Sequence, residues 1–245
     1  TPVYNWIEHK MTNYKWWRSR FKRHLNQVNI LRLDHFRALV AFWAVKGNES
    51  TAQSGMWINS PGDELLGLFK IDFGKKLPLI AEDLGVINES VEVLRDKFEL
   101  PGMKILQFAF DGNEDNPYLP ENISGNRWVV YTGTHDNPTT TSWWSNLGED
   151  LKQSIINRFS DTQNSPVNQL IDFGLETDAC LFIVPLQDLL ALDDLARFNK
   201  PGTIGNNWNW RIKSFDKIIK NSLNDFGDRS YHYGRKFDDA LKLFN

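Results

Sequence analysis

Short apolar runs recur along the chain, and their alternation of apolar and polar positions is typical of half-buried β-strands. In the first run, residues 29–34, Ile30, Arg32 and Asp34 fall on one face and two leucines fall on the other. The remaining runs predict strands at residues 77–85, 103–110, 128–136 and 180–185. Five strands are therefore predicted.

Amphipathic segments separate these runs and predict helices. Residues 14–27 form one such segment, and Asn13 is placed to cap its N-terminus. Residues 88–98 form another, with Asn88 as the N-cap and two glutamates in the first turns, where the helix dipole favours acidic residues. The other predicted helices lie near residues 64–69, 140–147, 150–159 and 167–176, with two more after residue 210.

Strands and helices alternate along the chain, which predicts a parallel sheet built from βα units. Asp34 and Asp136 lie three predicted units apart, an average of 34 residues per unit, close to the roughly 31 of a complete (β/α)8 TIM barrel. With five strands predicted, three strands of such a barrel would be absent. Residues 36–45 predict a short helix or a wall beside the site, and residues 46–63 and 199–210 predict loops.

Composition and charge narrow the class of protein. Of the 245 residues, 41% are hydrophobic and 24% are charged, with a net charge of −3, which indicates a globular protein of one large domain or two small ones. No block of like charge suggests a nucleic-acid or membrane surface. The locally basic residues 15–24 carry aromatic residues at helical spacing, so they predict a helix with one solvated face.

The single cysteine, Cys180, excludes an intramolecular disulfide and a thiolate metal cluster. It lies in an apolar run, which predicts a buried, inert thiol. No apolar run approaches the roughly 20 residues that a membrane span needs, and the first residues show no signal-peptide pattern. We expect a cytoplasmic protein, or one of the plastid stroma if the source is a photosynthetic eukaryote.

Aromatic residues are abundant: 10 Trp, 6 Tyr and 16 Phe. Several lie in polar segments that contain Gly or Pro, where a large ring has little core to join. Because sugar rings present flat C–H faces that stack on aromatic side chains, carbohydrate binding is one interpretation, and a structural role for each ring is the other. These residues are Trp57, Tyr118, Trp208 and Trp210.

Asp34, Glu82 and Asp136 each lie at the C-terminal end of a predicted strand. In a parallel barrel these ends share one rim, so the three carboxylates would converge there. Two carboxylates roughly 5–5.5 Å apart can cleave a glycosidic bond, one as the nucleophile and the other as the acid. Arg32 would keep Asp34 ionised, the apolar run before Glu82 would raise its pKa, and Asp136 would hold sugar hydroxyls and stabilise the transition state.

Other interpretations of these residues stay open from the sequence. The Arg32–Asp34 pair fits a surface ion pair on an edge strand equally well. Asp83 lies on the face opposite Ile80, which favours a structural or helix-capping acid over a functional one. A metal site is compatible with the residue types Asp34, His35, Glu82 and Asp136, but their spacing matches no metal-binding pattern. His35 otherwise packs or anchors a loop, and His135, next to Asp136, is a candidate donor to a sugar hydroxyl.

Three segments carry a resemblance to a known family: R-L-D-H-F-R at 32–37, A-E-D-L-G at 81–85 and Y-T-G-T-H-D-N at 131–137. They resemble signature segments of the 4-α-glucanotransferases, the amylomaltases or disproportionating enzymes of the α-amylase superfamily. Their order and spacing agree with that family. Further similar segments lie at residues 4–6, 51–55, 106–111, 116–120 and 201–211.

The resemblance implies that Asp34 is the nucleophile, Glu82 the general acid/base and Asp136 the transition-state stabiliser. It implies a retaining double displacement on α-1,4-glucans and maltooligosaccharides, in which the 4-hydroxyl of a second glucan displaces Asp34 from a covalent glucosyl-enzyme. It implies no cofactor, and the spacing and charge patterns above predict no metal and neither nucleic acid nor a membrane as a partner. The implied substrate-binding residues are Arg32, His135, Asn137 and Trp57.

The chain departs from the family pattern in two ways. The usual R-I-D-H-F-R-G-F has Leu33, Ala38 and Leu39 here, and Ala38 in place of glycine would tighten the turn. The segments that the family has upstream are also missing: the first three barrel strands, the aspartate-bearing segment on the third, and an aromatic acceptor loop. We therefore expect residues 1–245 to form a single catalytic barrel domain with strands four to eight, the C-terminal part of a longer enzyme. Such an opened barrel would be marginal in solution because it exposes sheet edges and apolar surface.

Two alternatives to a transferase stay open. An α-glucan hydrolase of the same superfamily differs only in letting water reach the intermediate. A non-catalytic glucan-binding remnant would keep the aromatic residues and lack a complete site.

Overall fold

The computed structural model describes residues 2–85, 87–159 and 164–235. The chain divides into two compact units: unit 1 extends to Met103 and unit 2 begins at Lys104. Parallel strand pairs occur in both units, as expected for an α/β protein built from βα units. Among the described residues, none of the helices is long and apolar enough to cross a membrane.

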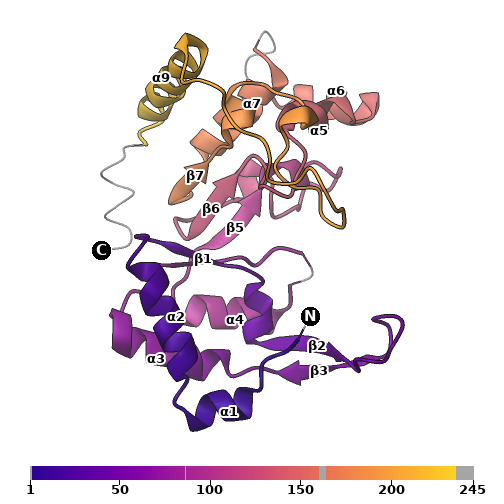
Figure 1. Cartoon of the computed structure of the whole chain (residues 1–245). Helices are drawn as coiled ribbons and strands as arrows, with labels where there is room; N and C mark the ends of the chain where they lie inside the picture. Colours follow the sequence, from indigo (N-terminus) through magenta and orange to yellow (C-terminus); the bar gives the residue numbers. More distant parts are fainter. Residues whose placement is uncertain (1, 86, 160–163, 236–245) are drawn as a thin grey trace. The chain divides into compact units, whose positions relative to one another are not determined.

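Unit 1 is built on a parallel pair of short strands, β1 (Leu31–Leu33) and β4 (Leu79–Ala81). Leu31 pairs with Leu79 and Leu33 with Ala81. Figure 1 shows the helices of unit 1 below β1. They are α1 (Trp6–Met11), α2 (Lys15–Leu25), α3 (Gly62–Phe73) and α4 (Glu89–Lys97).

Large apolar side chains from these helices and strands form one core in unit 1. Phe21 of α2 lies against Phe69 of α3, with ring centroids 4.0 Å apart, and both rings are buried with Leu79 of β4. Burying each such ring contributes roughly 1.5–3 kcal/mol relative to leaving it exposed. This packing explains why α2 has one apolar face, as its sequence predicted.

The start of α2 differs from the prediction. The N-cap is Tyr14 instead of Asn13, and it has a left-handed backbone with φ of 53° and no capping hydrogen bond from its side chain. Asn13 is also left-handed, with φ of 50°, because the chain turns sharply there out of α1, a helix that the sequence pattern did not predict. The buried Tyr14 ring holds this turn, and its hydroxyl donates to Glu64 at 3.2 Å.

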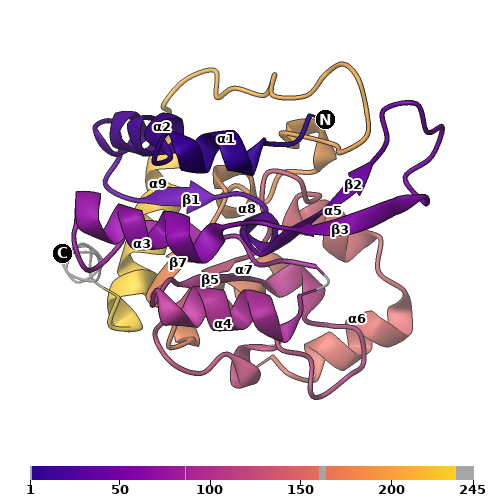
Figure 2. The same ribbon diagram turned by 90° about the horizontal axis from the view of Figure 1, so that it is seen from below.

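Residues 46–63 are not one long loop. The segment after the 3-10 helix Phe36–Leu39 is a strand, β2 (Ala41–Val45), which pairs antiparallel with β3 (Gly55–Asn59). Trp43 lies opposite Trp57, with ring centroids 5.5 Å apart. Cross-strand aromatic pairs of this kind stabilise a hairpin although its linker is polar. Figures 1 and 2 both show the hairpin extending beyond the helices of unit 1.

Unit 2 contains a sheet in the order β5-β6-β7, with β6 and β7 parallel. Its strands are β5 (Gly102–Ile105), which begins at the boundary of unit 1, β6 (Trp128–Tyr131) and β7 (Leu181–Ile183). Its helices are α5 (Thr140–Ser145), α6 (Glu149–Ile156), α7 (Pro166–Glu176), α8 (Leu186–Leu189) and α9 (Lys217–His232). Short 3-10 helices cover Leu106–Phe108, Pro120–Asn122 and Asp194–Ala196.

All five predicted strands exist, but each is shorter than its apolar run. The run 103–110, for example, continues from β5 into a 3-10 helix. Asn88 caps α4 as predicted, accepting a hydrogen bond from the Val91 N–H at 3.3 Å. Of the two helices predicted after residue 210, α9 is present and the second lies outside the described residues.

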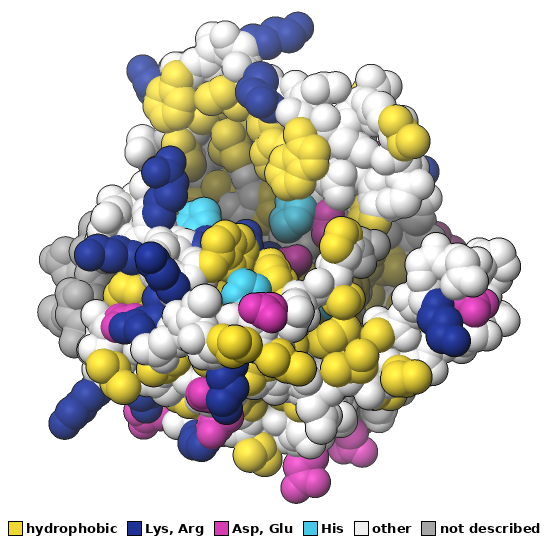
Figure 3. Space-filling model, turned by 60° about the horizontal axis from the view of Figure 1, so that its bottom comes forward, with side chains coloured by type: hydrophobic (Ala, Val, Ile, Leu, Met, Phe, Trp, Pro, Cys, Tyr) yellow, Lys and Arg dark blue, Asp and Glu magenta, His cyan; other side chains and the backbone are white. Residues whose placement is uncertain are grey.

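Large apolar side chains are exposed in both units, and Figure 3 shows several such patches on one face. In unit 1, Met56 and Trp57 of the hairpin are 63% and 52% exposed. In unit 2, Ile204 and Trp208 of the segment before α9 are also exposed. Each of these two segments also carries a tryptophan that the sequence marked as a candidate for sugar stacking.

Candidate active site

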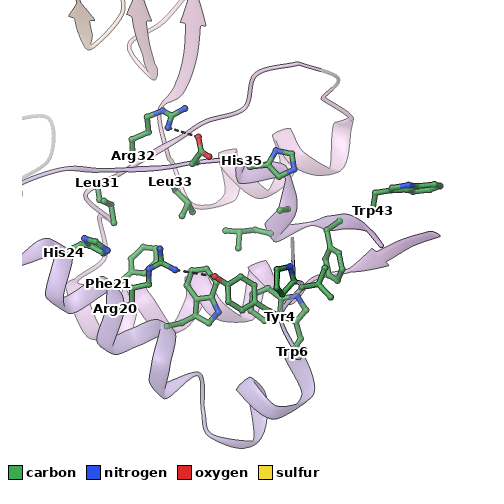
Figure 4. Close-up of a pocket in the computed structure, with 17 residues that line it drawn as sticks. Tyr4, Trp6, Arg20, Phe21, His24, Leu31, Arg32, Leu33, His35 and Trp43 are labelled. Atoms are coloured by element: carbon green, nitrogen blue, oxygen red, sulfur yellow. Dashed lines mark hydrogen bonds and ion pairs between the residues drawn. The ribbon is translucent and has the colours of Figure 1, made fainter. Parts of the chain in front are cut away.

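Arg32 of β1 and Asp34, the residue directly after the strand, lie side by side, as the period-2 pattern predicted. The Nη1 of Arg32 lies 2.8 Å from Oδ1 of Asp34, and the Asp34 side chain is 76% exposed. Figure 4 shows this ion pair at the edge of a pocket. The Nε of Arg32 also lies 3.3 Å from Sδ of Met103, which fixes the guanidinium. Asp34 is therefore oriented by a cation and still open to a ligand.

Glu82 follows β4, and its carboxylate accepts one backbone N–H from the chain after β1 and one from the chain after β4. The His35 N–H donates to Oε2 at 2.6 Å, and the Leu84 N–H donates to Oε1 at 3.1 Å. The backbone supports the same corner, because the Glu82 N–H donates to the Leu33 carbonyl at 3.0 Å. His35 is left-handed, with φ of 50°. This uncommon conformation turns the chain directly after Asp34.

Burial raises the pKa of the Glu82 carboxyl above its ordinary value. The two backbone N–H donors and the positive charge of Arg32 oppose that rise, and the negative charge of Asp34 adds to it. Asp34 and Glu82 thus have different environments: one is exposed and paired with a cation, and the other is partly buried with a raised pKa. Such a difference is what assigns nucleophile and acid roles to two carboxylates.

Asp83 has a structural role, one of the two that the sequence favoured, and it does not cap a helix. Its carboxylate is buried, with Oδ2 at 2.5 Å from Nη1 of Arg95 and Oδ1 accepting the Met103 N–H at 2.8 Å. It therefore ties α4 and the start of β5 to the end of β4.

The pocket beside Asp34 is a cavity of about 500 Å³ in unit 1. Its walls are mainly apolar and aromatic, including Tyr4, Trp6 and Phe21, with Arg32 and His35 among the polar lining (Figure 4). It has the size of a small-molecule site. The His35 side chain lines this pocket, while its backbone holds Glu82.

Trp57 lies on the β2–β3 hairpin, half exposed. The guanidinium of Arg37 lies 4.3 Å from the centroid of its ring, a cation–π distance. Trp43 adds a second indole, 39% exposed, whose Nε1 donates to the Ala52 carbonyl at 2.7 Å. The sequence interpretation did not single out Trp43, because it lies in a continuous apolar run, V-A-F-W-A-V at residues 40–45, with no polar alternation.

In unit 2, His135, Asp136 and Asn137 lie in the loop between β6 and α5. Oδ1 of Asp136 accepts a hydrogen bond from Nδ2 of Asn199 at 2.6 Å and lies 3.5 Å from Nε2 of His135. Nη2 of Arg197 donates to the Asp136 carbonyl at 2.6 Å. Arg197 and Asn199 were not predicted, because they are distant in sequence and carry no pattern of their own.

The neighbours of Asp136 have mixed roles. Oδ1 of Asn137 accepts from the N–H and the hydroxyl of Thr134, at 2.9 and 2.8 Å, so this oxygen closes a turn. The His135 ring lies against Trp208, with ring centroids 5.1 Å apart. Two other rings proposed for stacking have protein neighbours: Trp210 lies 5.8 Å from Phe198, and Tyr118 lies 5.7 Å from Phe108.

The predicted site residues thus form two groups. Unit 1 brings together Arg32, Asp34 and Glu82, with Trp57 on its hairpin, and unit 2 brings together His135, Asp136 and Asn137. In the ranges that the structure describes, no group of three or more His, Cys, Asp or Glu side chains is arranged to hold a metal ion.

Comparison with known proteins gives a consistent result. The family model described as 4-alpha-glucanotransferase matches residues 1–217. The chain is 46% identical over 211 residues to the 4-alpha-glucanotransferase of Synechocystis sp., covering 86% of this chain and 42% of the relative. It is 41% identical over 224 residues to that of Clostridium butyricum, covering 91% and 45%. The chain thus spans less than half the length of these relatives.

Solved structures agree. The amylomaltase from Streptococcus agalactiae in complex with acarbose matches with a TM-score of 0.88 at 33% identity, covering 96% of this chain and 47% of that one. The amylomaltase from Corynebacterium glutamicum matches with a TM-score of 0.74 at 16% identity, which shows likeness of fold alone. Because a family model matches residues 1–217 and relatives of that name are 41–46% identical, the chain belongs to the 4-alpha-glucanotransferase family.

Proposed function

We propose that the protein transfers α-1,4-glucan segments from a donor maltooligosaccharide to the 4-hydroxyl of an acceptor glucan or glucose. The observation that carries this proposal is the contrast between Asp34 and Glu82. Asp34 is exposed and paired with Arg32, and Glu82 is partly buried with a raised pKa. A retaining enzyme needs such a pair, one carboxylate that stays ionised and one acid that keeps its proton.

In the proposed reaction, a carboxylate oxygen of Asp34 attacks the anomeric carbon of the donor. The glycosidic C–O bond breaks, and Glu82 gives its proton to the departing 4-oxygen. Glu82 then takes the proton of the acceptor 4-hydroxyl as that oxygen displaces Asp34, so the configuration is retained and Glu82 is protonated again. Asp136 would stabilise the positive charge that develops on the sugar. Arg32, His135, Asn137 and Trp57 would bind substrate, and no cofactor is required.

We also propose that β1, β4, β5, β6 and β7 are strands four to eight of a (β/α)8 barrel. Residues 1–245 would then be part of one catalytic barrel domain. The coverage of 42–47% of the relatives supports this proposal, as does the parallel pairing of β1 with β4 and of β6 with β7. The cytoplasm, or the plastid stroma in a photosynthetic eukaryote, is the proposed location; the Solanum tuberosum relative is named as chloroplastic/amyloplastic.

The proposal is tested by supplying maltotriose to the whole protein and separating the products. A transferase releases glucose together with oligosaccharides longer than maltotriose, and Asp34→Ala abolishes both. Products of hydrolysis alone would replace the transferase by an α-glucan hydrolase. If the wild-type protein has no turnover and Asp34→Ala leaves glucan binding intact, the protein is a glucan-binding module instead.

A further inference from the structure

A buried carboxylate that the proposed reaction does not use lies beneath the loop of Asp136. Asp188, on α8 in unit 2, is 2% exposed. Its Oδ1 accepts the Thr140 N–H at 2.7 Å, and its Oδ2 accepts the hydroxyls of Thr132 at 2.6 Å and Thr140 at 2.7 Å. Burying a carboxylate without hydrogen-bond partners costs free energy, and the three donors offset that cost.

The partners of Asp188 are the two ends of the loop that carries the candidate site residues. Thr132 follows the last residue of β6, and Thr140 is the first residue of α5. His135, Asp136 and Asn137 all lie between these threonines. The Asp188 carboxylate therefore binds both ends of this loop. The backbone between Thr132 and Thr140 is anchored at each end.

Gln107, which follows β5, reinforces the same base. Its N–H donates to the Thr132 carbonyl at 3.2 Å, and its Nε2 donates to the Pro138 carbonyl at 3.1 Å and to the Thr140 hydroxyl at 3.3 Å. A Cβ on Gly133 would lie 2.8 Å from that Nε2. The glycine therefore allows the amide of Gln107 to reach under the loop.

The segment that follows Asp188 also hydrogen-bonds the loop. Oδ1 of Asp194 accepts the Thr139 N–H at 2.9 Å. Arg197 donates to the Asp136 carbonyl, and Asn199 donates to its carboxylate, both at 2.6 Å. Residues from the segment 188–199 thus hydrogen-bond the loop at both of its ends and at the Asp136 carboxylate.

We propose that Asp188 is a positioning residue for Asp136. By fixing Thr132 and Thr140, it sets the direction in which the loop presents the Asp136 carboxylate to a bound sugar. This inference rests on the proposed function for its catalytic consequence, but the positioning itself is a property of the folded chain and is measured separately. Burial raises the pKa of the Asp188 carboxyl, in keeping with an interior group removed from solvent.

The test compares Asp188→Ala with Asp172→Ala in the whole protein. Asp172 is the matched control, since its carboxylate also lies in unit 2 and pairs with Arg229 of α9 at 2.6 Å. Two kinds of measurement are made: hydrogen exchange at the amides of Asn137 and Asn199, and the kinetics (kcat and KM) of transfer from maltotriose. Both amides donate to loop carbonyls, Asn137 to Thr134 and Asn199 to His135.

We expect Asp188→Ala to speed exchange at these two amides by about tenfold or more. We expect kcat to fall by about 100-fold, since small misplacements cost that much, and KM to change by less than about threefold. Asp172→Ala should lower the melting temperature and leave exchange and kcat near wild type. Equal loop exchange in the two variants would overturn the inference. If Asp188→Ala does not fold, Thr132→Val replaces it. The changes in exchange and in kcat should then have the same direction and be smaller. If wild type shows no transfer, the proposed function fails, and exchange alone still decides the positioning role.

Discussion

The corner of unit 1 around Asp34 and Glu82 and the Asp136 loop of unit 2 hold their carboxylates in different ways. In unit 1 the support is local to the two strands. Asp34 pairs with an arginine two residues before it, and Glu82 accepts the backbone N–H groups of His35 and Leu84. In unit 2 the support is remote in sequence: Asp136 is held by residues 61 and 63 positions later.

This difference separates function from stability. An exposed carboxylate beside its own strand can be changed without loosening the fold. A loop held from a distant segment loses both its shape and its contribution to stability when that segment is changed. Substitutions at the two sites test this contrast, from the largest expected effect to the smallest.

Neutralising the proposed nucleophile should have the largest effect and should spare the fold. Asp34→Asn is expected to reduce transfer by roughly 10⁴-fold or more, because no other group would form the covalent intermediate. Its melting temperature should stay close to wild type, since exposed ion pairs contribute about 0–1 kcal/mol. Product analysis with maltotriose and calorimetry measure the two effects. Asp63→Asn, at another exposed ion pair of unit 1, is the control and should change neither.

The same contrast explains which parts of the site could be predicted from the sequence. The unit 1 corner was predictable because Arg32, Asp34 and Glu82 lie at the ends of apolar runs, and alternation placed arginine and aspartate on the same face. The strands themselves were found for the same reason. Their ends were overestimated, because apolar residues after a strand also fill 3-10 turns, as Leu106 and Phe108 do.

Three features were not predicted from the sequence pattern, because each depends on contacts between residues that are distant in sequence. The β2–β3 hairpin depends on a tryptophan pair across 14 residues of sequence, and its polar linker is typical of a loop. The left-handed Tyr14 depends on a buried ring that contacts α3. Arg197 and Asn199 act only because the fold returns them to the Asp136 loop. None of these is visible as periodicity.

Removing the buried acid next to Glu82 should cost stability more than any exposed change. Asp83→Ala leaves Arg95 buried without this partner, which is expected to lower the free energy of unfolding by about 3–5 kcal/mol. Asp96→Ala is the control: it removes the other carboxylate of the same arginine, but an exposed one, and should cost less than about 1 kcal/mol. Urea unfolding measures both. Equal losses would show that burial of Asp83 is not what matters.

Breaking the remote support of Asp136 should change stability and activity together. Arg197→Ala removes hydrogen bonds to the carbonyls of Asp136 and Asn199. We expect a loss of about 1–3 kcal/mol in unfolding free energy and of roughly tenfold in kcat. Urea unfolding and transfer kinetics test the two losses. A change in stability with unaltered kcat would contradict the view that this segment orients Asp136.

The smallest expected effect is on the pKa of Glu82, which removal of each neighbouring charge should shift in opposite directions. Because Asp34 raises the pKa of Glu82 and Arg32 lowers it, Asp34→Asn should lower that pKa and Arg32→Gln should raise it. Both are read from the ¹³C resonance of the Glu82 carboxyl as a function of pH. Asp63→Asn should leave it unchanged.

The same titration fixes a pH dependence of stability and activity. The pKa of Glu82 is raised in the folded protein, so the stability that its protonated form contributes is fully present below the ordinary glutamate pKa, about 4.3. It is lost as pH rises through the folded pKa. Activity should fall over the same upper range, since the proposed acid loses its proton there. An unchanged pKa in both Asp34→Asn and Arg32→Gln would mean that burial and the backbone donors, and not these two charges, set it. Glu82 and Asp34 would then not act as one electrostatic unit, and the unit 1 corner would lose the property that most distinguishes it from the Asp136 loop.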